Sequence, residues 1–563
     1  MILSPSRFRL VVVALVAWTL IAWLRLAQVQ VLQHERWHRE ATRQQERSVP
    51  VNQPRGDIRT RDGRLLAGSV QRVSVYAIPG QIPAARVQAV AESLSPLVGL
   101  SAEETRNRLA GRNAFFYLGR DFDPEIARAV IGLHVRGVGI HSNERRVYPH
   151  GPLAGPVVGW VNADGEGQAG IERAYQNTLA GSPAVYREFR DGRRMPTALE
   201  LRQEKAGRQG MSLVLTLDSR IQQLVEEELL RTTVAVGAAG AAGVVMDPYT
   251  GEVLALVSLP AYDPGALGLV PPEWRRNRAV EDAVEPGSSF KPFILAAALS
   301  EGVLSPAELI DCTGGGIQVG NTFFRDNGRY GALPLHEMLA KSSNVGAIRI
   351  AHRLNPDVME AALRRFGFGS RTGIEMPAEA SGILRSQRHW SQLSRAGIAL
   401  GQEVSTSALQ MARAYAAIAN GGRLITPTLV RETRSRSGEV AVPFRPQKGE
   451  QVLPPDAAAL LRELLEFAVT KGTGKGAHLA GYRVAGKTGT AQRAMAGGYA
   501  GGHHAAWFAG FLPAHRPQVV LVLYIDQPST AYWASEVAAP TAGRIAAGLL
   551  PMLGLLPIEG FTT

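Results

Sequence analysis

Three short groups of residues in the second half of the chain combine a nucleophile, a base and hydrogen-bond donors. The first, Ser288-Ser289-Phe290-Lys291, follows Glu285-Pro286-Gly287 and precedes an apolar run, which predicts the start of a helix. Residues three apart share a helix face, so we expect Ser288 and Lys291 side by side near the positive end of the helix dipole. A serine hydroxyl needs a base, and a lysine whose pKa is lowered by burial can be that base. The pattern therefore predicts Ser288 as a nucleophile and Lys291 as its base.

The second group is Ser342-Ser343-Asn344, which opens another predicted helix. Ser342 has the chemistry to relay a proton between Lys291 and a leaving group. The amide of Asn344 can hydrogen-bond both a peptide substrate and Lys291. We therefore expect Ser342 and Asn344 to complete the catalytic set.

The third group, Lys487-Thr488-Gly489-Thr490, lies in a predicted strand. Such a strand, carrying Lys487 and Thr488, could align an extended peptide by β-addition and bind its carboxylate. Gly489 would let the backbone approach the substrate closely. The N–H groups of Thr490 and Ser288 are the predicted oxyanion hole.

Each group alone is weak evidence, because a Ser-x-x-Lys pair arises by chance on the surfaces of many helices. All three in this order are stronger evidence. Only seven of the 61 Lys and Arg residues are lysine, yet Lys291 and Lys487 both fall in these groups. Lysine can lose its proton in a buried site and arginine cannot, so the scarcity of lysine supports a deprotonable base.

The elements around the three groups predict an α+β domain. Asp218 ends a predicted strand, 212–218, and is a plausible N-cap for a helix over 219–230. A hairpin is expected at 241–259, strands at 481–484, 505–511 and 519–525, and helices at 408–419 and 539–550. Because helices lie between early and late strands, we expect an antiparallel sheet built from both ends of the domain.

The start of the chain predicts a membrane anchor. Residues 10–24 are apolar and uncharged, Arg7 and Arg9 precede them, and Arg25 follows. Arginines that snorkel would extend the span to about residues 8–32, and the basic tail favours a cytoplasmic N-terminus. A cleaved signal peptide is the alternative, but no small-x-small cleavage site follows the apolar run.

Between the anchor and the catalytic domain we expect a polar helical stalk over 33–46 and then short strands and helices, including a helix over 83–94. The stretch 187–210 is rich in charge and glycine, which favours a linker. The expected boundaries are a tail at 1–9, an anchor at 10–32, a first extracytoplasmic domain at 33–205 and the catalytic domain at 206–563.

Composition excludes several other classes of protein. The net charge of +12 is spread along the chain without a basic tract or nucleic-acid motif, so a membrane surface or an anionic wall polymer fits better than nucleic acid. The single cysteine, Cys312, forms no intrachain disulfide and is expected to be a small buried hydrophobe. His503-His504 lacks a third ligand at a useful spacing, so no metal site is predicted.

The three groups resemble the motifs of the serine β-lactamase and penicillin-binding superfamily. The approach to Ser288, from Asn277-Arg278-Ala279, is similar to that in division-specific class B penicillin-binding proteins of the FtsI type (penicillin-binding protein 3-like). Three N-terminal stretches resemble the motifs of that family's pedestal domain: Arg55-Gly56 with Arg61 and Gly63, Arg146 to Pro149, and Gly167 to Glu172. Thr60 departs from the family, which usually has aspartate there; this puts an ion pair in doubt, but not the chemistry.

The resemblance implies a transpeptidase domain with an antiparallel sheet and helices, an elongated mixed α+β pedestal and one transmembrane helix. It implies a D,D-transpeptidase that acylates Ser288 with peptidoglycan stem peptides on nascent glycan and is blocked by β-lactams, without a metal or cofactor. The implied partners are an FtsW-type glycosyltransferase and bitopic division proteins, at the cytoplasmic (inner) membrane with the catalytic domain outside.

Several related functions share the three motifs. A β-lactamase or β-lactam sensor is one, but class A hydrolysis needs a glutamate that activates water, and no Glu-x-x-x-Asn lies between Asn344 and Lys487. A carboxypeptidase and a non-catalytic scaffold are others. Within the family, elongation and sporulation enzymes are the alternatives to a septal one. Glu172 and Arg146 are expected to be structural partners in the pedestal, and Lys341 a surface charge.

Overall fold

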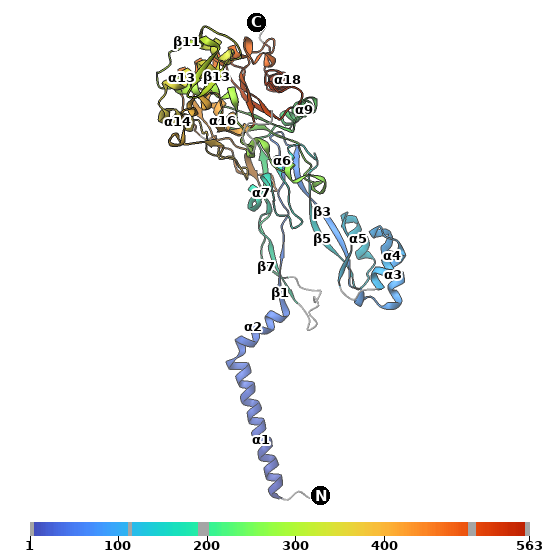
Figure 1. Cartoon of the computed structure of the whole chain (residues 1–563). Coiled ribbons are helices and arrows are strands. Elements are labelled where there is room, and N and C mark those ends of the chain that lie inside the picture. Colours follow the sequence, from blue (N-terminus) through green and yellow to red (C-terminus); the bar gives the residue numbers. More distant parts are fainter. Residues whose placement is uncertain (1–4, 111–114, 190–201, 447, 494–502, 558–563) are drawn as a thin grey trace. The chain divides into compact units, whose positions relative to one another are not determined.

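The computed structural model describes residues 5–110, 115–189, 202–446, 448–493 and 503–557 (Figure 1). It divides into two compact units. One contains Met1–Pro54 and Ala180–Gly210, and the other contains Arg55–Leu179 and Met211–Thr563. Each unit is described by itself.

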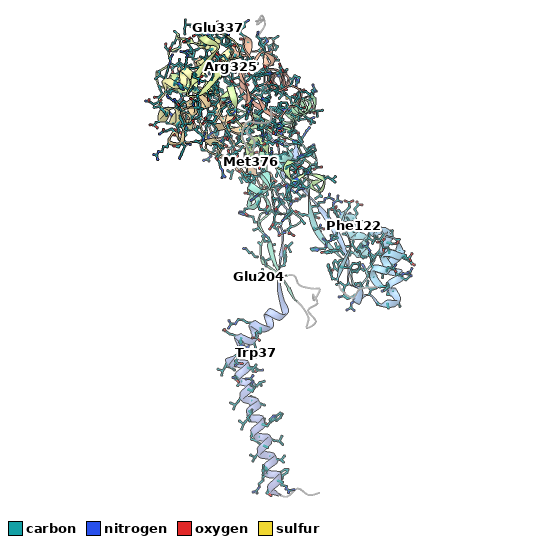
Figure 2. All side chains as sticks on the ribbon, viewed as in Figure 1. Trp37, Phe122, Glu204, Arg325, Glu337 and Met376 are labelled. Atoms are coloured by element: carbon teal, nitrogen blue, oxygen red, sulfur yellow. The ribbon has the colours of Figure 1, made fainter. Side chains whose placement is uncertain are left out.

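The first unit begins with an apolar helix, α1 (Pro5–Ala27). Its large apolar side chains are exposed along its length (Figure 2). The segment Ser6–Leu32 is the one stretch in the described chain with the length and hydropathy to cross a membrane, although a signal sequence meets the same test. The polar helix expected next is α2 (His34–Gln45).

The rest of this unit is a three-stranded sheet of β1 (Glu46–Val51), β6 (Ala184–Phe189) and β7 (Arg202–Lys205). The prediction of a linker over 187–210 is therefore wrong at 187–189 and 202–205; residues 190–201 lie outside the described chain. The physical reason is the antiparallel pairing of β6 with β1, from Glu46↔Phe189 to Val51↔Ala184. Long-range backbone pairing overrides the local charge and glycine content of the segment.

The second unit contains a small α/β lobe with a core of its own. Its central strand β3 (Leu65–Ala77) pairs with β4 (Phe116–Phe122) and, over ten residues, with β5 (Val138–Val147). Helices α3 (Val87–Val98), α4 (Ala102–Ala110) and α5 (Pro124–Gly132) complete the lobe. Val75 and Ala77 of β3 pack with Leu94 of α3 and Leu118 of β4. The helix expected over 83–94 thus forms as a short 3-10 turn followed by α3.

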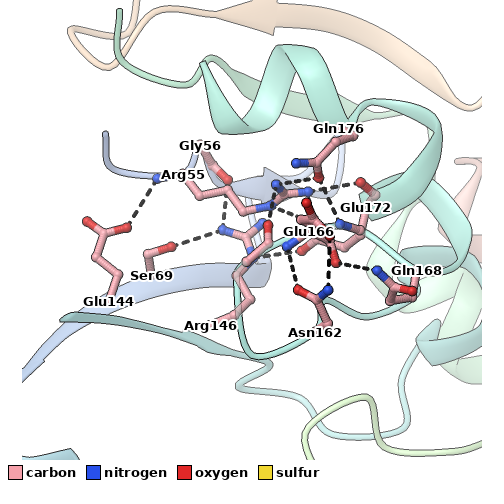
Figure 3. Close-up of polar contacts among 12 residues, drawn as sticks. Arg55, Gly56, Ser69, Glu144, Arg146, Asn162, Glu166, Gln168, Glu172 and Gln176 are labelled. Carbon is pink, nitrogen blue, oxygen red and sulfur yellow. Dashed lines mark hydrogen bonds and ion pairs between the residues drawn. The ribbon is translucent and has the colours of Figure 1, made fainter. Parts of the chain in front are cut away.

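A buried charge cluster lies where the pedestal motifs meet (Figure 3). Glu172, in α7 (Gly170–Ala174), has no exposed side-chain surface and binds Arg55 and Arg146, each at 2.6 Å. Arg55 also donates to Gln176 Oε1, and Arg146 donates to the carbonyl oxygen of Gly56. Buried charges persist only when they are paired and hydrogen-bonded. The structure therefore confirms Glu172 and Arg146 as structural partners.

The pedestal strand β2 (Ile58–Arg59) pairs with β8 (Ser212–Leu215), the first strand that follows the pedestal. Nearby, Asp62 accepts hydrogen bonds from the backbone and hydroxyl of Ser219 at the start of α9 (Ser219–Ala235). Arg61 lies 3.9 Å from Glu252. Thr60 itself accepts a hydrogen bond from the backbone N–H of Arg64. The charged contacts at this place are made by its neighbours Arg61 and Asp62.

The catalytic domain is built on a five-stranded antiparallel sheet in the order β10-β9-β23-β22-β21. Its strands are β9 (Gly240–Met246), β10 (Val253–Leu259), β21 (Ala485–Gln492), β22 (His504–Leu512) and β23 (Val519–Asp526). The predicted sheet from both ends of the domain is confirmed. The strand expected at 481–484 is wrong: Gly481 adopts φ +79° in a turn, and β21 begins only at Ala485.

Helices cover both faces of this sheet. Val245 packs in a cluster with residues of α9 and α18 (Ala538–Met552). Its neighbour Val244 packs in a second cluster with residues of α11 (Lys291–Ser300) and α16 (Ala408–Ala419). Successive side chains of a strand point to opposite faces, so a sheet covered twice requires continuous apolar strands. The motif helix α11 is thereby fixed against the sheet that carries Lys487.

Candidate active site

Ser288 lies in a 3-10 turn, Gly287–Phe290, and the α-helix begins only at Lys291. We had expected both residues in the first turn of one α-helix. The expectation of one shared α-helical turn is therefore wrong, and the approach of the Ser288 hydroxyl to Lys291 stays a prediction. Gly287 has φ +55° and donates its N–H to the carbonyl oxygen of Gly401, which fixes the turn before the serine.

Lys291 is fully buried and held by the second motif. Its Nζ donates to the carbonyl oxygen of Ser342 at 2.6 Å, to Oγ of Ser342 at 3.2 Å and to Oδ1 of Asn344 at 2.8 Å. Burial lowers the pKa of Lys291 to about 7, against the opposing charge of Asp326. A lysine with this pKa is a base at neutral pH.

Asp326 positions the second motif. Its carboxylate accepts the hydroxyl of Ser343 at 2.7 Å and the backbone N–H groups of Asn344 and Val345. It thus caps α13 (Asn344–Arg353), a favourable place for a negative charge. The preceding Ser342 adopts φ +59°, a left-handed conformation that is uncommon for residues other than glycine.

Asn344 has both ends of its amide engaged. Oδ1 accepts from Lys291, and Nδ2 donates to the carbonyl oxygen of Arg325 at 2.7 Å; Arg325 is labelled in Figure 2. One N–H of Nδ2 remains to meet a peptide substrate.

The third motif occupies β21, the edge strand of the sheet. Lys487 is almost fully buried, and its Nζ donates to the carbonyl oxygen of Thr488 at 3.0 Å. Burial and the neighbouring Lys291 lower the pKa of Lys487. A Cβ on Gly489 would lie 2.2 Å from the carbonyl oxygen of Pro286, so this glycine admits the turn before Ser288. We had expected the close approach at Gly489 to be made by substrate.

These residues surround one cleft of about 470 Å³. The predicted residues Ser288, Ser342, Asn344, Thr488 and Thr490 line it. Lys291 and Lys487 lie behind the lining, because their side chains are 0% and 1% exposed. The other lining residues are Gly287, Asn327, Leu400, Gln402, Thr473, Ala491, Gln492, His504, Tyr532, Trp533 and Ser535.

Part of the cleft lining, His504, Tyr532 and Trp533, could not be identified from the sequence. His504 stacks on Tyr532 at 4.2 Å between ring centroids, and Tyr532 contacts Trp533 at 5.1 Å. Thr490 Oγ1 accepts the N–H of Ala534, which ties this aromatic loop to β21. The sequence indicates His504 only as a possible metal ligand, and no periodic pattern marks residues 532–535.

The geometry supplies a nucleophile, a base of suitable pKa and a free strand edge on one cleft. Two family descriptions match the chain. "Penicillin binding protein transpeptidase domain" matches residues 241–547, and "Penicillin-binding Protein dimerisation domain" matches residues 50–215. The chain belongs to the class B penicillin-binding proteins.

Named relatives of this class B penicillin-binding protein cover most of its length. It is 34% identical to "Probable peptidoglycan D,D-transpeptidase PenA" of Neisseria meningitidis, over 90% of this chain and 86% of that one. It is 31% identical to "Peptidoglycan D,D-transpeptidase FtsI" of Escherichia coli K12, over 96% and 90%. It is also 31% identical to "Stage V sporulation protein D" of Bacillus subtilis, over 91% and 80%.

A solved structure agrees with this class B fold. Penicillin binding protein 3 of Mycobacterium tuberculosis, complexed with aztreonam, superposes with a TM-score of 0.70 at 28% identity. The alignment covers 92% of this chain and 99% of the other. The chain is therefore a serine-type acyltransferase of the transpeptidase family.

Proposed function

We propose that this protein is a peptidoglycan D,D-transpeptidase that cross-links stem peptides through an acyl-enzyme on Ser288. The contact of Lys291 with Ser342 and Asn344 carries this proposal, because it joins a base of pKa about 7 to the cleft that Ser288 lines. The names of the relatives support peptidoglycan as the substrate.

In acylation, Ser288 Oγ attacks the carbonyl carbon of the penultimate D-Ala and gives its proton to neutral Lys291. The oxyanion is stabilised by the N–H groups of Ser288 and Thr490. The bond to the terminal D-Ala then breaks, and its nitrogen takes a proton from Ser342, which recovers one from Lys291. The donor peptide pairs with the free edge of β21.

In the second half-reaction an amine of a neighbouring stem peptide attacks the ester. Its proton passes to Lys291, and the departing Ser288 oxygen takes the proton back. Penicillins acylate the same serine, but the amine that leaves the carbonyl carbon stays attached to the acyl-enzyme. No step requires a metal or cofactor.

We also propose that the enzyme works at the division septum, anchored by Ser6–Leu32 with its catalytic domain outside the cytoplasmic membrane. The similarity to FtsI and the approach to Ser288 favour division. An FtsW-type glycosyltransferase and bitopic division proteins are the proposed partners, contacting the anchor and pedestal. The proposal includes the expected domain boundaries, with the tail ending at residue 9, the anchor at residue 32 and the pedestal at residue 205.

The acyl-enzyme is tested on the full chain in detergent, by intact mass after incubation with penicillin. We expect an adduct on the wild type, slow to hydrolyse, and no adduct on Ser288→Ala. An adduct that persists in the variant overturns the nucleophile. Rapid penicillin hydrolysis without accumulation identifies a β-lactamase instead.

The septal role is tested by depletion of the protein in its own organism. Filamentous cells with unfinished septa are the expected result. Rounded cells would point to elongation, and a defect confined to spore formation would point to sporulation, as the similarity to Stage V sporulation protein D allows.

A further inference from the structure

The strands β3, β4 and β5 of the α/β lobe have one covered face and one open face. Val75 and Ala77 of β3 pack in the core of the lobe with residues of its helices (Figure 1). Successive side chains of a strand point to opposite faces, so Tyr76, between them, lies on the other face. Tyr76 pairs with Gly139 of β5, and His141 shares the face of Gly139 because it lies two residues further along β5.

The open face carries a cluster of rings, which we call the aromatic face: Tyr76, Phe115, Tyr117 and His141. The ring centroids of Tyr76 and Phe115 lie 5.0 Å apart, and those of Phe115 and Tyr117 lie 5.1 Å apart. The rings of Tyr117 and His141 are inclined by only 14°, and the hydroxyl of Tyr117 is hydrogen-bonded to Nδ1 of His141 at 3.0 Å. The four rings therefore form one continuous surface.

This surface is accessible to solvent. Phe115 is 50% exposed, His141 is exposed, and Tyr76 and Tyr117 are half-buried. Large apolar rings are usually buried, and exposed rings that gather in one place mark a binding surface. The core of the lobe lies on the opposite face of the strands, so packing of the core does not account for the cluster.

A cation belongs to the aromatic face. Cζ of Arg120 lies 4.1 Å from the ring centroid of Tyr117, the geometry of a cation–π contact. Arg72 and Arg145 of the same lobe both pair with Asp121. Within the described residues no ion pair joins Arg120 to a carboxylate, so its charge is available to an anion.

We propose that the aromatic face binds a glycan strand of the peptidoglycan, with a sugar ring stacked on Phe115 and the anionic groups of the strand held by Arg120. This contact with the polymer is made by residues that do not line the cleft of Ser288. The inference deepens the function proposed above and rests on it.

The chemistry of a glycan strand matches this surface. A pyranose ring has a face of C–H groups, whose small positive charge is attracted to the negative face of an aromatic ring. Its hydroxyl and N-acetyl groups lie at the edge of the ring and need hydrogen-bond partners. The hydroxyl of Tyr117 and the amide of Asn143, which follows His141 on the open side of β5, supply such partners. The lactyl and peptide carboxylates of the strand complement the charge of Arg120.

The distribution of charge favours a glycan over a protein partner. The core of a protein–protein interface is depleted of charged residues. Here a guanidinium group lies over Tyr117, in the middle of the cluster, and Arg145 shares the open face of the strands. A surface on which rings alternate with polar groups suits a linear polymer of sugar rings better than an apolar protein segment.

The test measures binding to the full chain in detergent, after penicillin has acylated Ser288 and so occupied the cleft. One probe is soluble anionic glycan strands released from peptidoglycan, and the other is an uncharged chitin oligomer. The variants are Phe115→Ala and Arg120→Gln. The matched controls are Ile131→Ala and Arg128→Gln, which remove an exposed apolar side chain and an exposed cation from α5 of the same lobe.

Phe115→Ala should weaken the binding of both probes about threefold to tenfold, the effect of one lost stacking contact. Phe115→Tyr keeps the ring and should bind as the wild type does. Arg120→Gln should weaken binding of the anionic strands by a similar factor, less so at high salt, and should leave binding of the chitin oligomer within about twofold. The controls should change neither, and unchanged unfolding temperatures would show that the variants are folded.

A wild-type protein that binds neither sugar probe would overturn the proposal and leave this face to a protein partner. Equal losses in Phe115→Ala and Ile131→Ala would also overturn it, because the loss would then not depend on the aromatic face. Failure of the proposed function is distinct from these results. It would appear as a wild-type protein that penicillin does not label at Ser288, on which binding of the two sugar probes can still be measured.

Discussion

Nζ of Lys291 lies 2.6 Å from the carbonyl oxygen of Ser342 and 3.2 Å from its hydroxyl. The base is thus fixed by the backbone of the second motif, 51 residues later in the chain, and the hydroxyl of Ser342 is within reach of any proton that the base holds. The left-handed conformation of Ser342 at φ +59° turns both groups toward the lysine. The two motifs are therefore joined in one hydrogen-bonded unit.

Lys291→Arg should abolish acylation while preserving positive charge at the site. Arginine stays protonated in proteins and cannot accept the proton of Ser288. A general base contributes about 10²- to 10⁴-fold, so the rate of penicillin acylation should fall by at least about a hundredfold. Intact mass against time measures it. Lys341→Arg is the control, since Lys341 pairs with Glu337 at the surface; a Lys291→Arg enzyme as active as this control would contradict the role of the base.

The acylation rate should rise with pH through about 7. Burial lowers the pKa of Lys291 to that value, against the opposing charge of Asp326. Below it the amine is protonated and has no lone pair, so the rate should fall about tenfold for each pH unit. Above it the rate should be level. Stopped-flow acylation between pH 5.5 and 8.5 is the measurement, and a flat profile would exclude Lys291 as the titrating base.

The chemical motifs could be predicted from sequence because chemistry dictates residue types, as at Ser288 and Lys291. The sheet could be predicted because strands such as 241–247 and 519–525 lie early and late in the domain, with helices between them. The contacts of Asp326 and Thr473 could not be predicted, because each is made with another segment of the chain, Asp326 with Asn344 and Thr473 with Lys487. No local spacing records such a pairing.

The same reason accounts for the errors in secondary structure. The start of β21 was placed at Gly481, although a positive φ there makes a turn. The end of β6 has the charge of a linker, and its partner β1 lies more than a hundred residues away in sequence. Loop closure over such a distance leaves no local periodicity to detect.

Asp326→Asn should slow acylation and shift its pH profile. The carboxylate accepts three hydrogen bonds at the start of α13, and an amide oxygen replaces them less well, so a loss of about tenfold to a hundredfold is expected. Asp326 also raises the pKa of Lys291, so its removal should move the rising limb to lower pH. Asp311→Asn, which alters an exposed pair with Arg349, is the control. A slower enzyme with an unmoved limb would leave Asp326 a purely structural role.

Glu172→Gln should destabilise the pedestal without altering the chemistry. The change leaves Arg55 and Arg146 buried without their shared counter-ion, and breaking a buried ion pair in this way costs about 3–5 kcal/mol. The unfolding temperature should fall by roughly 5–15 °C in differential scanning calorimetry.

Glu166→Gln, at an exposed carboxylate of the same region, should change the unfolding temperature little. Because none of the cluster lines the cleft, penicillin acylation at 20 °C should stay within about twofold of the wild type. An unchanged unfolding temperature would show that the two arginines find other partners, and the cluster would then not be what holds the pedestal motifs together.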